Sequence, residues 1–111
     1  MGNSQSSTEI VIDEEKLSPD GDGYQDFLLI RYNMNRLGYV ARVQIYDAVG
    51  RPIKMLVDAE LFGQEGLLQW DGSNDKGEKA STGIYIVEIQ LTHPDGTVKR
   101  YRKNCVVASK L

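Results

Sequence analysis

Three aspartates in a glycine-rich stretch have the residue type and spacing to bind a metal ion. Asp20, Asp22 and Asp26 occupy positions i, i+2 and i+6 of the segment Asp-Gly-Asp-Gly-Tyr-Gln-Asp. Calcium takes about six to eight oxygen ligands, and glycines let the backbone turn tightly enough for carboxylates to converge on one cation. This spacing is therefore compatible with a calcium site formed by the three carboxylates.

The ligand set of this segment is incomplete. It lacks the distant bidentate glutamate of the helix-loop-helix calcium loop, so the acidic run 13–15, the carbonyl of Tyr24 or water would have to complete the shell. Asp-Gly is also common turn chemistry, in which the carboxylate is solvated. The segment is thus either a calcium loop or a pair of Asp-Gly turns.

A second acidic segment contains Asp71, Asn74 and Asp75. Side chains of these types hydrogen-bond to nearby backbone amides in turns. Lys76 and Lys79 dilute the negative charge of the segment. We therefore interpret it as a capped loop between strands and not as a metal site.

Catalytic constellations are missing from the sequence. His93, the only histidine, precedes a proline at the start of a turn, and we interpret it as an exposed turn residue. Cys105, the only cysteine, falls in an alternating strand, which favours a small buried hydrophobic side chain over a nucleophile. Two segments have closely spaced glycines, Gly-Asp-Gly at 21–23 and Gly-Gln-Glu-Gly at 63–66. Neither has the lysine, the hydroxyl residue and the following helix of a phosphate loop. The sequence predicts a protein that is not an enzyme.

Basic residues are concentrated in residues 99–103, Lys-Arg-Tyr-Arg-Lys. In a strand, Lys99, Tyr101 and Lys103 point to one face, and Arg100 and Arg102 point to the other. This division weakens a nucleic-acid surface and favours a solvated edge strand, in which charge opposes unwanted pairing. A docking surface for a secretion or partner protein is the alternative interpretation.

The composition indicates one globular domain. The 111 residues are 41% hydrophobic and 26% charged, with a net charge of -3, which supplies no general attraction for nucleic acid or anionic lipid. No apolar run approaches the ~20 residues of a membrane span, and no signal peptide is visible. We predict a disordered leader or linker at residues 1–8 and a single domain at 9–111, monomeric in isolation and with no direct membrane insertion.

Seven strands follow from the alternation of apolar and polar residues. They are predicted at 9–13, 27–34, 41–46, 52–57, 66–70, 83–92 and 98–107. The strand at 27–34 is apolar on both faces, which predicts a central strand covered on both sides. Residues 58–62 could form at most a turn. Trp70 is the expected core anchor, with an indole nitrogen that needs one hydrogen-bond partner. We predict an all-β, immunoglobulin-like antiparallel β-sandwich of about seven strands.

The order of several motifs resembles the immunoglobulin-like domain of FlgD, the flagellar hook-capping protein, and the gliding-motility-associated, type IX secretion C-terminal domains. The segments are LSPDGDGYQD (17–26), VQIYDAVGRPIKML (43–56) and WDGSNDKGEKASTGIYIVEI (70–89). The first resembles the "SPNGDGxND" start of the secretion domains, from which Asp20 and Gln25 depart. The resemblance implies a non-catalytic module at the C-terminus of a larger secreted or cell-surface bacterial protein.

Three functions remain compatible with this resemblance. The first is a sorting or anchoring domain of type IX secretion, exported through the periplasm and engaged by the secretion machinery or by neighbouring domains of its parent protein. The second is a structural spacer or accessory adhesion domain within such a protein. The third is a carbohydrate-binding domain, which needs an exposed row of aromatic rings that only four tyrosines could supply: Tyr39, Tyr46, Tyr85 and Tyr101.

Overall fold

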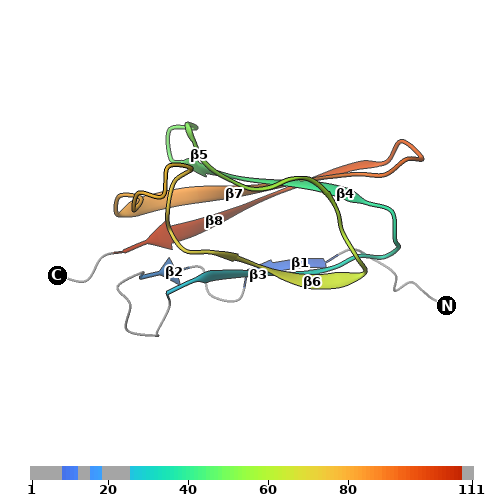
Figure 1. Cartoon of the computed structure of the whole chain (residues 1–111), viewed down its shortest axis with the longest axis horizontal. Helices are drawn as coiled ribbons and strands as arrows, with labels where there is room; N and C mark the ends of the chain where they lie inside the picture. The colour runs from blue at the N-terminus through green and yellow to red at the C-terminus, as the bar shows by residue number, and fades with distance from the viewer. Residues whose placement is uncertain (1–8, 13–15, 19–25, 109–111) are drawn as a thin grey trace.

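The computed structural model describes residues 9–12, 16–18 and 26–108, which form a β-sandwich (Figure 1). Seven of its strands have four or more residues, and β2 has two. The bounds are β1 Glu9–Ile12, β2 Lys16–Leu17, β3 Leu28–Asn33, β4 Val40–Asp47, β5 Pro52–Leu61, β6 Glu65–Trp70, β7 Gly83–Thr92 and β8 Val98–Val107. The prediction of an all-β sandwich is confirmed.

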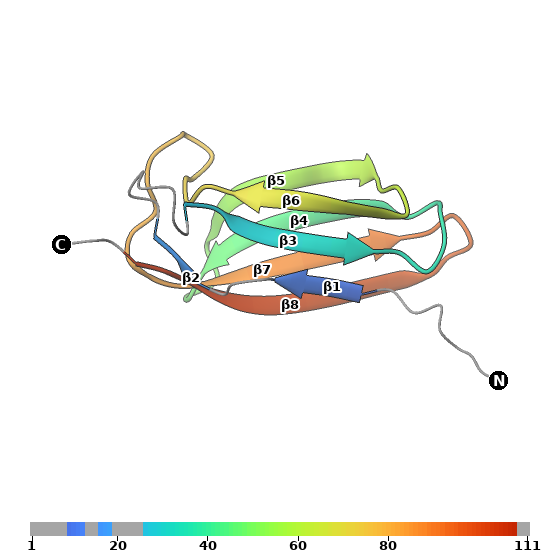
Figure 2. The same ribbon diagram turned by 90° about the horizontal axis from the view of Figure 1, so that it is seen from below.

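The strands form two facing sheets (Figure 2). The smaller has the order β1-β3-β6, and the larger has the order β2-β8-β7-β4-β5. All pairs are antiparallel except β2 with β8, where Leu17 lies opposite Val107 in a parallel register. The amide of Ala108 extends this pairing by donating to the Leu17 carbonyl at 2.8 Å. The predicted antiparallel sandwich is confirmed, and the short β2 adds one parallel pair to it.

The core lies between the sheets, where alternate residues of each strand meet. Leu28 and Ile30 of β3 face Val43, Ile45 and other buried side chains of the larger sheet. β3 is the central strand of its sheet, as predicted. Its predicted cover on both faces is wrong, because Phe27 just before it remains 49% exposed. One face of this strand is core and the other faces outward.

β5 continues to Leu61 and replaces the turn predicted at 58–62. Its pairing with β4 skips a residue: Ala41 lies opposite Glu60, and Val43 lies opposite Val57. The chain absorbs the extra length at a bulge in which Ala59 has φ 56°. Glycine is the usual residue at such a backbone angle, so alanine there provides no sequence signal for the bulge.

Trp70 ends β6 and is fully buried in the core. Its indole Nε1 donates to the Ser73 carbonyl at 2.8 Å, and its ring meets that of Tyr85 edge to face at 5.6 Å. The predicted role as a core anchor with one polar partner is confirmed. The hydrogen bond also attaches the start of the following loop to the core.

Tyr32 and Phe62 form a second aromatic contact at the other end of β6. Their rings stack at a centroid distance of 4.0 Å and an angle of 8°. Tyr32 lies directly opposite Gly66 in the β3–β6 register, and its ring covers the space that a Cβ at Gly66 would occupy. The glycine therefore makes room for the aromatic stack.

Candidate functional site

The aspartates predicted to bind calcium fall mostly outside the described residues. Asp20 and Asp22 are not described, and Asp26 lies half-buried two residues before β3. Within the described ranges, no cluster of three or more histidine, cysteine, aspartate or glutamate side chains could hold a metal. The calcium site remains a prediction from sequence.

The second acidic segment is a loop capped by its own side chains, as predicted. Asp71 Oδ1 accepts from the amide and the hydroxyl of Ser73 at 3.0 and 2.6 Å, and the hydroxyl contact contributes most to lowering the pKa of Asp71. Asn74 Oδ1 accepts from the amides of Lys76 and Glu78, both at 2.9 Å. These carbonyl and carboxylate oxygens are used in fixing the turn.

Asp75 of the same loop covers part of an edge strand. Its amide donates to the Ile53 carbonyl at 2.9 Å, and its Oδ1 accepts from the Met55 amide at 3.0 Å. Asp75 thus satisfies backbone groups of β5 that a neighbouring strand would otherwise pair. Sequence reasoning missed this role, because the contact joins residues 20 positions apart.

His93 is less exposed than its position in a turn suggested. It does begin the β7–β8 turn, but its side chain is only 15% exposed. Nε2 lies 3.0 Å from the Leu37 carbonyl, and Nδ1 lies 3.2 Å from the Asp95 amide. A neutral ring with its proton on Nε2 satisfies both contacts. The predicted exposed histidine is wrong because the β3–β4 loop folds over the ring.

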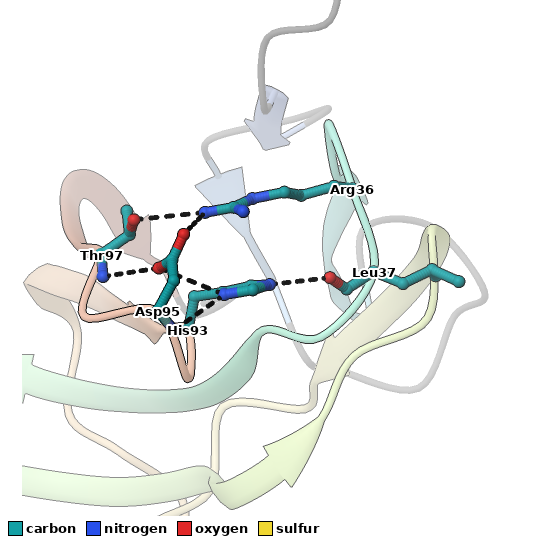
Figure 3. Close-up of polar contacts among 5 residues, drawn as sticks. All are labelled: Arg36, Leu37, His93, Asp95 and Thr97. Carbon is teal, nitrogen blue, oxygen red and sulfur yellow. Dashed lines mark hydrogen bonds and ion pairs between the residues drawn. The ribbon is translucent and has the colours of Figure 1, made fainter.

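Arg36 and Asp95 hold the same two loops together beside His93. Arg36 Nη2 lies 2.6 Å from Asp95 Oδ2 and donates to Thr97 Oγ1 at 3.2 Å (Figure 3). Asp95 Oδ1 also accepts from the Thr97 amide at 2.9 Å. This backbone hydrogen bond, followed by the Arg36 contact, holds the pKa of Asp95 far below its usual range. These contacts join the β3–β4 loop to the β7–β8 turn.

Asp95→Asn is expected to reduce the stability of the domain at neutral pH. Acid should destabilise the variant less than it destabilises the wild type. The folded-state pKa of Asp95 is lowered, so the carboxylate contributes stability above its unfolded pKa of about 3.9 and loses it as pH falls toward the folded value. The stability difference between wild type and variant should therefore narrow below about pH 4. Urea unfolding at a series of pH values measures it, and a difference that stays constant would contradict the assignment.

β8 carries the basic residues along an edge of the larger sheet. Lys99, Tyr101 and Lys103 are half-buried on the inner face, whereas Arg100 and Arg102 are exposed on the outer face. The predicted edge strand with cations on both faces is confirmed over the part that β2 does not cover.

The tyrosines do not form an exposed aromatic row. Tyr39 and Tyr85 are 1% and 5% exposed. Tyr46 and Tyr101 are half-buried and lie on opposite faces of the larger sheet, by the alternation of their strands. The four tyrosines therefore cannot form the stacking platform that a carbohydrate-binding function was expected to need. Cys105 is 1% exposed, which confirms its expected burial.

Two solved structures share the fold of this chain. The chain is 20% identical to dimeric latent PorU from Porphyromonas gingivalis, with a TM-score of 0.69. The match covers 93% of this chain but only 9% of the PorU chain. It is 18% identical to FlgD from P. aeruginosa, with a TM-score of 0.59. That match covers 93% of this chain and 78% of the FlgD chain. These likenesses show a shared immunoglobulin-like sandwich. No curated protein matches the chain.

The family follows from a match over nearly the whole sequence. The model of the CHU_C type IX secretion signal domain matches residues 10–106, from β1 to the penultimate residue of β8. This family is defined by a secretion signal and not by a catalytic activity. No helix in the described part of the chain is long and apolar enough to cross a membrane. The chain therefore belongs to the CHU_C type IX secretion signal domain family, whose members act in secreted or cell-surface proteins.

Proposed function

We propose that this domain is a non-catalytic sorting module, which the type IX secretion machinery recognises in its folded form. The observation that carries the proposal is the extent of the family match: residues 10–106 include both sheets. A signal that spans a whole sandwich fits recognition of a folded surface better than recognition of a short linear peptide. The parent protein would then be carried to the cell surface or the medium.

The described side chains support a non-catalytic role. Both ring nitrogens of His93 lie within hydrogen-bond distance of backbone groups, and the Cys105 thiol is buried in the core. A general base or a nucleophile must reach its substrate, which neither residue does in this arrangement. The arrangement thus favours recognition over catalysis.

A reporter fusion tests the sorting function. The 111-residue chain, placed after a signal peptide and a fluorescent protein, should carry the fluorescence to the surface or medium of a cell that has the type IX system. The same fusion should stay in the periplasm of a translocon-null strain, as should the reporter without the domain. Periplasmic retention in both strains, with the domain folded, would instead identify a structural spacer.

We further propose that Asp20, Asp22 and Asp26 bind calcium. Support comes from three carboxylates within seven glycine-rich residues, which suit a hard cation. Calcium that binds only the folded state should raise the melting temperature, and EDTA should lower it. Asp22→Ala should remove this response, whereas Asp58→Ala, which deletes an exposed carboxylate on β5, should keep it. Equal midpoints with calcium and with EDTA in the wild type would contradict the site.

A further inference from the structure

One side of β8 is a strand edge that the described strands leave largely unpaired. β7 pairs with all of β8, from Val98 opposite Thr92 to Val107 opposite Gly83. On the other side, β2 reaches only Val106 and Val107. Among the described residues, no strand pairs with the outer side of β8 from 98 to 104. The backbone groups on this side can therefore accept a further strand.

The opposite edge of the same sheet is built differently. Asp75 already hydrogen-bonds to β5 at Ile53 and Met55, and the bulge at Ala59 distorts the remainder. Bulges and covering loops are common protections of an edge against strand addition. β8 pairs with β7 in an unbroken register, so its backbone is regular. Of these two edges, β8 is the one suited to pairing.

Cations lie along both faces of the exposed part of β8. Lys99 and Lys103 are on the inner face, and Arg100 and Arg102 are on the outer face. Arg102 forms an ion pair with Glu88 of β7 at 3.2 Å, and its side chain stays 67% exposed. The order Lys-Arg-Tyr-Arg-Lys reads the same in both directions. The positive charges are therefore divided between the two faces of the strand and do not form one flat basic surface.

Charge on both faces suits one kind of ligand. A strand added beside β8 also points successive side chains to opposite faces, so acidic residues at neighbouring positions would meet the lysines on one face and the arginines on the other. A second copy of β8 would instead place like charges opposite each other, which destabilises pairing. The edge thus disfavours its own copy and favours an acidic segment.

We propose that the outer edge of β8, from Val98 to Asn104, binds an extended acidic segment of a partner protein as an additional β-strand. This inference rests on the proposed sorting function, for which it names the surface that the export machinery contacts. Backbone hydrogen bonds to β8 hold the segment, and the four cations select its charge. The palindromic order of the cations allows the segment to run parallel or antiparallel to β8.

A peptide of matching charge tests the proposal on the purified 111-residue chain. The probe is a dye-labelled peptide, acetyl-Thr-Val-Glu-Glu-Tyr-Glu-Glu-Val-Thr-amide, and fluorescence anisotropy measures its binding at low salt. Saturable binding is expected. Arg100→Glu with Arg102→Glu, or Lys99→Glu with Lys103→Glu, should each weaken binding by at least about tenfold, since both cross-strand attractions become repulsions.

Two controls separate strand addition from simple charge attraction. Lys76→Glu with Lys79→Glu changes net charge by the same amount on exposed loop residues and should leave affinity within about twofold. A probe with alternate amides N-methylated keeps its charge but loses its strand-pairing donors, and it should not bind. Equal binding of the methylated probe, or no saturable binding of the unmodified probe, would overturn the proposal.

Folding and export are checked separately. Thermal unfolding of each variant excludes a folding defect, and Arg100→Gln with Arg102→Gln replaces the reversed pair if that variant does not fold. The peptide assay contains no translocon, so its failure would overturn the β8 surface and leave the sorting function standing. Failed export of the wild-type fusion would reject the sorting function without changing the peptide result.

Discussion

Trp70→Ala is expected to destabilise the domain by about 3 to 5 kcal/mol. The side chain is fully buried, and its loss would leave a cavity between the sheets. The Ser73 carbonyl would also lose its hydrogen bond from the indole, and Tyr85 would lose its edge-to-face partner. Urea unfolding followed by circular dichroism measures the loss. A domain of this size has a total stability of only about 5 to 15 kcal/mol, so the substitution should remove a large share of it.

Trp70→Phe separates the two contributions of this residue. Phenylalanine keeps much of the apolar volume but cannot donate to Ser73, so a loss of about 1 to 3 kcal/mol is expected. If Trp70→Phe were as damaging as Trp70→Ala, the hydrogen bond and not packing would dominate. If Trp70→Ala cost under about 1 kcal/mol, Trp70 would not be the core anchor.

Gly66→Ala is expected to have the second largest effect, a loss of about 2 to 3 kcal/mol. The added methyl group would overlap the Tyr32 ring, which lies directly opposite on β3. The ring cannot move aside cheaply, because it stacks on the buried Phe62. The same urea titration measures the loss.

Gly63→Ala is the matched control for this substitution. A Cβ at Gly63 would meet no atom within 4 Å, so this change should be nearly neutral. In a Tyr32→Ala background, Gly66→Ala should cost much less, since the space above the glycine is then open. A loss that did not depend on residue 32 would show that the flexibility of glycine, and not the aromatic ring, is what β6 requires.

The strand pattern and the acidic loop could be predicted from residues that act locally. Alternation placed β7 at 83–92 and β8 at 98–107, which are their observed bounds. Asp71 and Asn74 cap their turn through contacts no more than four residues apart. Such features depend on a two-residue period or on neighbouring side chains, so the linear sequence contains the information they need.

Other features depend on segments that meet only in the folded chain. β2 is too short to carry a pattern, and it is a strand only because Leu17 lies beside Val107. The bulge at Ala59 arises where β5 keeps its pairing with β4. His93 was expected to be exposed, and Leu37 from a loop 56 residues away covers it.

The basic run on β8 combines both kinds of information. The residue types and their alternation determine that Lys99 and Lys103 lie on one face, with Arg100 and Arg102 on the other. Whether that strand is central or at an edge depends on the order of strands in the sheet, which is set by contacts between distant segments. Sequence therefore determined the charges of this surface. Its availability for pairing was decided by packing, because burying the two apolar faces against each other fixes which strands have neighbours on both sides.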